Sequence, residues 1–507
     1  MMKRTIFPHR SACITLSAML AACTLLHGAL PAAAEHYDVY SYDRWDEAVP
    51  SQAGYLAERA VSGRNLGIGS LNEPTDLFLD AQNRLYIVDS QNNRIVVTDA
   101  DVSEVLRVAD KFTMPDGSET NLSVPTGIYI APETGLWYIA DHDNSRVLVA
   151  DDKGQVQMEI TKPDSELFPA NMTFLPQRVL ADKAGNVYVV LGNITTGAAM
   201  FGADGSFMGY YGANTVEATS KVVADYFWKL ISTEEMRSRQ ARTVPTGITS
   251  FDLDSEGFIY TCTQSTSQRK DMVKKLNPAG NNLFANEYVS WGDYQSVYDK
   301  NTNISYQSML CDIDISDDGS INCLDLTAGR VFQYDKDGNL LFIFGTKADQ
   351  LGGFSEAAAL ESYKNSVLVL DKRKGTVTVF RETDFGKAVH HATNLYNGGY
   401  YAEAIQPWQD VLRYDGNYRR AFLGLSAGYL VQGDYKASME YAKLADSSYR
   451  YDRAFECWRQ EWLAAHGKQI LTVILLCILA GILAPHVYKR YRSRRKFFRK
   501  HRKEGAV

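Results

Sequence analysis

The sequence predicts a mainly β protein with a small helical region and one membrane-spanning helix near its C-terminus. The first sign is self-similarity: residues 83–97 recur as residues 135–149, at an offset of 52. The second is alternation, because runs of five or six residues with period two are broken by Asp, Asn and Gly, as in antiparallel sheets. Units of three or four such strands, repeated radially, predict a β-propeller.

Composition limits the classes of protein that this chain can belong to. It has 507 residues, 45% of them hydrophobic, with 30 Tyr, 21 Phe and 7 Trp, so it can bury several cores and is not disordered throughout. The net charge of -7 hides an asymmetry. Residues 35–488 alone carry -19, because 1–34 hold three basic and no acidic residues and 489–507 hold ten basic and one acidic. An acidic middle argues against a nucleic-acid partner.

The N-terminus has the pattern of a secretory signal peptide over residues 1–34. Lys3, Arg4 and Arg10 precede an apolar run that ends in three alanines, Ala32 to Ala34. An uncleaved anchor is one alternative. Lipidation at Cys23 is another, because Leu20 to Cys23 resembles a bacterial lipobox.

Residues 35–383 are expected to form a propeller of six blades. Weaker copies of the repeat follow the first two, at 176–211, 245–284, 312–330 and 367–380. The sixth copy offers only three strands, so we expect Tyr55 to Val61 to supply its fourth and close the ring, which leaves no unpaired sheet edge there. This pattern resembles the NHL repeat over about residues 60–382, and NHL-type propellers usually close with six blades.

An Asp-x-x-Asn-x-Arg motif ends the second predicted strand of the first two units, as Asp89 with Arg94 and Asp141 with Arg146. Asp325 and Arg330 keep the same spacing in the fifth unit. A catalytic carboxylate is one interpretation. Recurrence favours the other, in which the carboxylate satisfies backbone donors and the arginine spans neighbouring strands.

Two insertions break the period, at 216–242 and 286–307. Long insertions between blades project from one face and often carry binding. Their aromatic residues predict partner contacts for Phe227, Trp228 and Trp291. The alternative is that the first insertion is a helix packed flat on the propeller.

From residue 384 to 468 the periodicity becomes helical. Residues 399–405 are matched by 433–439, each with a Gly, an aromatic residue two positions later and a small residue three after that. This 34-residue period is similar to the tetratricopeptide repeat. A peptide groove using Tyr401 and Trp408 is one hypothesis; a rigid stalk is the other.

Residues 469–488 are expected to cross a membrane. Ile470 to Pro485 carry no charge, and a basic tail follows at 489–507. The positive-inside rule places that tail in the cytoplasm, against anionic lipid, and residues 35–468 outside the cell membrane.

The chemistry expected of the ring lies at the mouth of its channel. Residues at the starts of the innermost strands include Asp76, Arg178 and Asp312, which could hold a divalent cation or a sugar hydroxyl. No cofactor is predicted, and His142 is the one histidine between residues 60 and 382, which argues against a multi-histidine zinc site. Cys311 and Cys323 flank a predicted turn, so a disulfide and two free thiols both stay open.

These observations favour a non-enzymatic, single-pass surface protein that binds a protein or a glycan. Proteins that join such repeats to a span resemble accessory parts of membrane transport assemblies. The alternative is a lactonase-like, metal-dependent hydrolase or lyase with its ion near Asp76 and Asp312.

Overall fold

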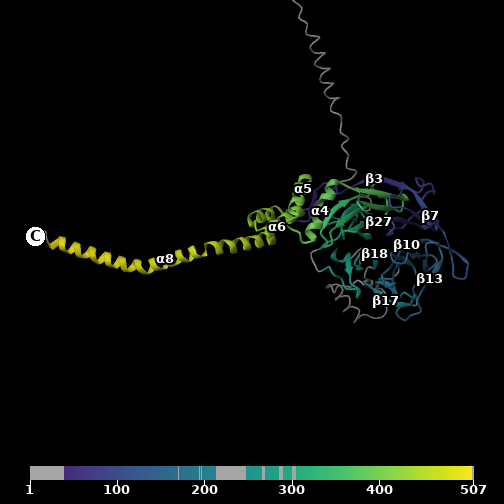
Figure 1. The fold of residues 1–507 in the computed structure, drawn as a ribbon, viewed down its shortest axis with the longest axis horizontal. Helices are drawn as coiled ribbons and strands as arrows, with labels where there is room; N and C mark the ends of the chain where they lie inside the picture. Colours follow the sequence, from purple (N-terminus) through teal and green to yellow (C-terminus); the bar gives the residue numbers. More distant parts are fainter. Residues whose placement is uncertain are drawn as a thin grey trace, which may run out of the picture.

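The computed structural model describes residues 39–504, apart from 170, 193, 196, 213–246, 265–268, 285–288 and 300–303. The predicted signal peptide at 1–34 and the insertion at 216–242 therefore lie outside the described residues. The described part consists of a ring of sheets, a set of helices on one side of it and a long projecting helix (Figure 1).

The ring is a six-bladed β-propeller, as expected. Its six sheets follow one another along the chain, and their innermost strands contact each other in order until the sixth meets the first. The strands of blades one to three are β4 (Asp76–Leu79), β5 (Arg84–Asp89), β6 (Arg94–Asp99), β7 (Val105–Ala109); β10 (Pro125–Ile130), β11 (Trp137–Asp141), β12 (Arg146–Ala150), β13 (Val156–Ile160); β14 (Pro176–Ala181), β15 (Val187–Leu191), β16 (Ala198–Phe201) and β17 (Phe207–Tyr211). Those of blades four to six are β18 (Ile248–Leu253), β19 (Ile259–Thr263), β20 (Val273–Leu276); β23 (Leu310–Ile315), β24 (Ile321–Asp325), β25 (Arg330–Tyr334), β26 (Leu340–Phe344); β27 (Ala357–Tyr363), β28 (Ser366–Asp371), β29 (Thr376–Glu382) and β3 (Tyr55–Ser62).

The N-terminal strand β3 closes the ring. It pairs antiparallel with β29, with Tyr55 opposite Glu382 and Val61 opposite Val377. The expected closure by residues 55–61 is therefore confirmed. The two ends of the propeller sequence hold each other in one sheet, which gives the sixth blade its fourth strand.

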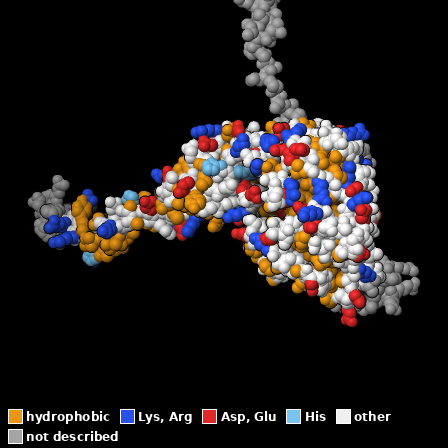
Figure 2. All heavy atoms as spheres, turned by 45° about the vertical axis from the view of Figure 1, so that its right-hand side comes forward, with side chains coloured by type: hydrophobic (Ala, Val, Ile, Leu, Met, Phe, Trp, Pro, Cys, Tyr) orange, Lys and Arg blue, Asp and Glu red, His pale blue; other side chains and the backbone are white. Residues whose placement is uncertain are grey.

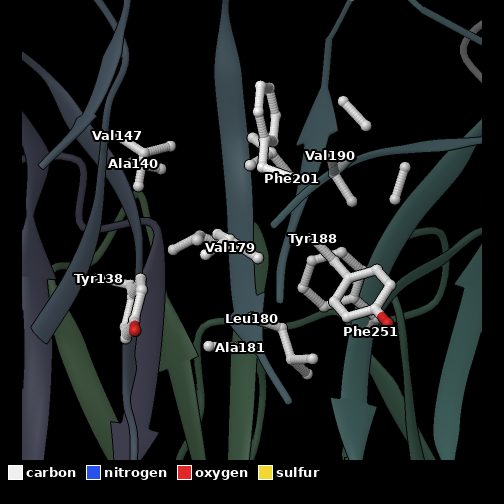
Figure 3. Close-up of a cluster of buried hydrophobic side chains, with 14 of the residues drawn as sticks. Tyr138, Ala140, Val147, Val179, Leu180, Ala181, Tyr188, Val190, Phe201 and Phe251 are labelled. Carbon is white, nitrogen blue, oxygen red and sulfur yellow. The ribbon is translucent and has the colours of Figure 1, made fainter. Parts of the chain in front are cut away.

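The core lies between the blades, because each sheet is covered on both faces by its neighbours. The strands accordingly read as nearly unbroken apolar runs, such as residues 85–88, all fully buried. Figure 3 shows one such cluster, in which Tyr138 and Val147 of blade two, Val179 and Tyr188 of blade three, and Phe251 of blade four lie together.

The repeated Asp and Arg side chains of the motif make structural hydrogen bonds and do not line a binding site. Asp89 accepts a hydrogen bond from the Asn72 amide at 2.7 Å and from Arg94 Nε at 2.7 Å. Asp141 does the same with the Ser123 amide and with Arg146 Nε, both at 2.7 Å. These contacts support the structural interpretation of the motif.

Outside the blades, the described residues form three two-stranded hairpins: β1 (Tyr40–Tyr42) with β2 (Ala48–Pro50), β8 (Lys111–Thr113) with β9 (Glu119–Asn121), and β21 (Val297–Asp299) with β22 (Ile304–Tyr306). The first is tied to blade five. The hydroxyls of Tyr40 and Tyr42 both donate to the buried carboxylate of Asp293, which also pairs with Arg330. In blade five, therefore, the motif arginine binds a carboxylate of the preceding insertion.

Four short helices form the neck that connects the ring to the projecting helix: α4 (Asp384–Asn397), α5 (Ile405–Tyr414), α6 (Arg419–Gln432) and α7 (Tyr435–Leu444). Consecutive helices contact each other. Close packing of α5 on α6 needs glycine, because a Cβ on Gly424 would lie 2.2 Å from Nε1 of Trp408. On the ring side, Phe385 packs edge-on against Phe342, and the Tyr418 hydroxyl donates to the Leu341 carbonyl at 3.1 Å.

The last helix, α8 (Ser448–Glu504), leaves the neck and projects away from the ring (Figure 1). It contains a stretch long and apolar enough to cross a membrane, none of it buried against the rest of the protein. Figure 2 shows hydrophobic side chains along this helix and Lys and Arg side chains toward its far end. The helix is thus a candidate membrane anchor.

Candidate functional site

The structure brings together the three predicted channel residues. Asp76, Arg178 and Asp312 lie on the innermost strands β4, β14 and β23. Arg178 Nη1 lies 2.9 Å from Asp76 Oδ1, and Nη2 lies 4.0 Å from Asp312 Oδ1. Their equivalent places in the repeat, at the starts of the innermost strands, put them at one level of the channel.

Arg178 binds backbone carbonyls at this level of the channel as well as the two carboxylates. Nη1 donates to the Thr75 carbonyl at 3.0 Å and the Thr126 carbonyl at 2.9 Å, and Nη2 donates to the Ala358 carbonyl at 3.3 Å. One guanidinium from blade three thereby joins blades one, two and six. Its charge lies between Asp76 and Asp312, where the alternative function would place a metal ion.

The channel aspartates also bind the inner strand of the next blade. Asp76 accepts from the Ile128 amide at 2.9 Å and Asp312 from the Leu360 amide at 2.8 Å. Asp252, from blade four, accepts from the Ile315 amide at 2.6 Å. Inner strands of neighbouring blades belong to separate sheets, so these bonds from backbone amides to carboxylates link one sheet to the next.

A second level of the channel carries carboxylates that the sequence analysis did not single out. Asp252, Asp314 and Glu361 lie two residues beyond Ser250, Asp312 and Ala359 on their strands, so the period-two alternation of a strand could have found them. The other wall at this level is apolar, made by Phe78, Tyr129 and Leu180, and the enclosed space is about 30 Å³. That is room for one or two water molecules.

Burial raises the pKa values of these carboxyl groups. The pKa of Asp76 is raised to about 7, although Arg178 opposes the rise, and burial raises that of Asp314 to about 6. For Asp252 and Glu361, burial and then the neighbouring carboxylates raise the pKa well above the ordinary value. Glu361 accepts no hydrogen bond from any described residue. The cluster can therefore hold protons near neutral pH.

The bonds of the channel carboxylates bear on whether they can hold a metal ion. Among the described residues, no group of three or more His, Cys, Asp or Glu side chains is arranged to hold one. Asp76, Asp252 and Asp312 already accept backbone hydrogen bonds, and two of them face Arg178.

A chain of hydrogen bonds leads from the channel to the neck through blade five. Asn322 Nδ2 donates to Asp314 at 2.8 Å, and Gln333 Nε2 donates to Asn322 Oδ1 at 2.8 Å. His390 Nε2, on α4, lies 2.8 Å from Gln333 Oε1, and its Nδ1 lies 2.5 Å from Glu382. Because each amide in this chain donates toward the channel, Nε2 of His390 must carry a hydrogen. The neck is thus bonded to the channel wall through buried polar groups.

The cysteines of the ring are free thiols, so the predicted alternative of a Cys311–Cys323 disulfide is not realised. Cys323 pairs across the ladder with Ile313, whereas Cys311 lies at a β-bulge before Asp312. The Cys311 thiol is directed to the carbonyls of Leu324 and Ala357, and burial raises its pKa well above the ordinary value.

Three of the five predicted partner-binding residues lie in the part of the chain that the structure describes. Phe227 and Trp228 lie outside the described residues. Trp291 and Trp408 are fully buried, Trp291 against Tyr334 and Trp408 between α5 and α6, so their side chains are core and cannot touch a partner in this structure. Tyr401 is half-buried, with its ring 4.9 Å from that of Tyr396.

A cleft lies between hairpin β1–β2 and the neck. Its volume is about 310 Å³, within the range of small-ligand and side-chain pockets. Trp45, at the hairpin turn, is 71% exposed at its rim, and Tyr418 and Phe422 of the neck contribute apolar lining. Arg44 crosses one side to pair with Asp446 at 2.9 Å.

Comparisons with known proteins add little to this geometry. No family model matches the sequence, and no curated protein matches it significantly. The structure is similar to virginiamycin B lyase from Staphylococcus aureus, with 8% identity and a TM-score of 0.38 over 64% of this chain and 99% of that one. Similar too are Kuenenia stuttgartiensis hydrazine synthase (10% identity, TM-score 0.38, 62% and 97%) and a streptogramin B lyase (10%, 0.38, 66% and 100%). With identities and TM-scores this low, the likenesses carry no argument about function.

Proposed function

We propose that this protein is a membrane-anchored binding or scaffold protein, whose ring and neck are displayed outside the cell membrane to hold a protein or glycan partner. The ring is of the NHL type and the neck of the tetratricopeptide type in this proposal. The signal peptide at 1–34 directs export, and the basic tail at 489–507 stays in the cytoplasm.

The observation that carries the proposal is the place of the cleft. It lies where hairpin β1–β2, itself bonded to blade five, meets the neck helices, so an occupant would touch both parts at once. Trp45 offers it a large exposed aromatic surface, the kind of side chain that dominates binding energies at interfaces. Only residues 445–447 separate the neck helix α7 from α8, so the anchor would hold whatever is bound near the membrane.

Affinity capture with the full-length protein, solubilised from its own membranes, tests the proposal. We expect a membrane or surface partner to be recovered with the wild-type chain and lost with Trp45→Ser. Leu167→Ser is the matched control, because Leu167 is 68% exposed on the ring far along the chain from the cleft, and it should keep the partner. If Trp45→Ser retained every partner, the cleft would not be the binding site.

The same purified protein separates binding from catalysis. Metal analysis should find no stoichiometric divalent ion if the protein only binds. A tightly held ion that is lost with Asp76→Asn and Asp312→Asn would favour the lactonase-like alternative instead.

A further inference from the structure

The projecting part of α8 carries a row of aromatic rings that are exposed or only partly buried. Phe455 and Trp458 have ring centroids 5.7 Å apart, Trp458 and Trp462 6.4 Å, and Trp462 and His466 4.8 Å. Phe455 is 38% exposed and Trp462 42% exposed. The spacing of three and four residues keeps the rings on one face of the helix, which is here called the aromatic seam (Phe455, Trp458, Trp462 and His466).

The membrane is too far away to cover most of this seam. The uncharged stretch begins at Ile470, so at 1.5 Å per residue Trp462 lies about 12 Å, Trp458 about 18 Å and Phe455 about 22 Å before it. The interfacial zone on each side of the hydrocarbon is only about 5–7 Å deep. Even a helix tilted by about 40° would keep Trp458 and Phe455 beyond that zone. His466 reaches the headgroups, but the membrane leaves the two rings farthest from the span uncovered.

We propose that the aromatic seam is the contact between two copies of this chain, whose α8 helices lie parallel. Because both copies are anchored in the same membrane, they have the same orientation, and each ring lies at the same distance from the membrane in both copies. The two seams can then pack against each other about a two-fold axis, with each residue beside its own counterpart. Confinement to the membrane raises the effective concentration of one copy for the other.

The rest of the helix face is compatible with this pairing. The rings follow the alternation of a heptad, with Phe455 and Trp462 at one kind of core position and Trp458 at the other. Across a parallel pair, Glu461 of one copy would lie near His466 of the other, and no two like charges are set opposite each other. The neck contacts α8 at the buried Ala454, one turn before Trp458, whereas Trp462, one turn further on, is exposed.

Disulfide trapping in native membranes tests the pairing with two adjacent residues. Ala465 lies three residues after Trp462 and seven after Trp458, on the seam face; Ala464 lies nine after Phe455, half a turn away from it. Both are exposed and at nearly the same depth. In a full-length chain with Cys457→Ser and Cys477→Ala, mild oxidation should convert A465C to a species of twice the monomer mass and leave A464C monomeric.

A second pair of variants shows whether the rings drive the contact. Trp458→Ser added to A465C should abolish the trapped dimer. Leu463→Ser, which removes an exposed apolar side chain from another face of the same turn, should leave the dimer in place. Equal trapping of A464C and A465C, absence of a dimer, or trapping of A465C to a different protein would each overturn the proposal.

Discussion

The two halves of the ring are built from the same repeat but differ in what they carry. Blades one and two keep the motif of Asp89 and Asp141, and the second channel level of blades one to three is apolar. Blades four to six line that level with Asp252, Asp314 and Glu361, and they bear hairpin β1–β2 and the neck. The parts of the chain that depart from the repeat, hairpin β1–β2 and the neck, are bonded to the second half.

The largest expected effect comes from removing the side chain that joins the halves. Arg178→Gln would leave Asp76 and Asp312 buried near each other without the guanidinium between them. Breaking a buried ion pair in this way costs about 3–5 kcal/mol of unfolding free energy. Chemical denaturation of the full-length protein at pH 8 measures this. Arg373→Gln, at a side chain 73% exposed, is the control and should change the denaturation midpoint little. An equal effect of both substitutions would mean that Arg178 does not hold the blades together.

The two versions of the motif arginine can be compared directly. Arg330→Gln removes the positive partner of buried Asp293, so the unfolding free energy should fall by about 1.5–3 kcal/mol, the worth of hydrogen bonds to charged groups. Hydrogen exchange should also rise in residues 40–50. Arg94→Gln, in blade one, should leave that hairpin protected, because its partner Asp89 lies within its own blade.

The bonded chain between channel and neck predicts a smaller, local effect. His390→Gln loses contact with Gln333 or Glu382, and we expect about 1 kcal/mol less stability in the neck, seen as faster hydrogen exchange in α4. The neighbouring His391 is exposed, so His391→Gln should leave α4 unchanged. Equal hydrogen exchange in α4 of the two variants would show that His390 does not stabilise the neck through this chain of hydrogen bonds.

The acidic half should also set the pH dependence of stability, with the smallest expected effect. Groups whose pKa is raised on folding bind more protons when folded, so their contribution is present at low pH and is lost as the pH rises. The raised pKa values of Asp314, about 6, and Asp76, about 7, place that loss between about pH 4 and 7. The melting temperature should fall across this window, apart from effects of the rest of the chain.

Glu361→Gln isolates this effect, because Glu361 accepts no hydrogen bond from a described residue and its pKa is raised well above the ordinary value. The variant should melt about 1 °C higher than wild type at pH 8, corresponding to about 1 kcal/mol, and show a flatter pH profile. Glu256→Gln, at an exposed turn of blade four, is the control. A lower melting temperature for Glu361→Gln would show that the carboxylate is needed where it is.

Much of this fold could be predicted from sequence because its repeat is local. The closing strand at Tyr55 follows from counting strands, and the meeting of Asp76, Arg178 and Asp312 follows from equivalent places in the repeat. The residues of the second channel level could have been predicted in the same way, because they lie two positions further along the same strands.

The surfaces could not be predicted in the same way. Trp291 and Trp408 sit in segments typical of binding, yet whether an aromatic side chain faces solvent depends on packing partners distant in sequence, such as Tyr334 and Gly424. The cleft beside Trp45 depends on a hairpin and a neck more than 350 residues apart, joined by Ser51 and Asp415 at 2.8 Å.

The central claim, a ring held outside the membrane by α8, is tested most directly by protease applied to intact cells that make the chain with a tag after Val507. We predict that the protease digests the ring and the neck, and that a tagged fragment containing the membrane span stays protected until the cells are lysed. A full-length chain that survives outside protease, or a tag that is digested in unbroken cells, would contradict the account.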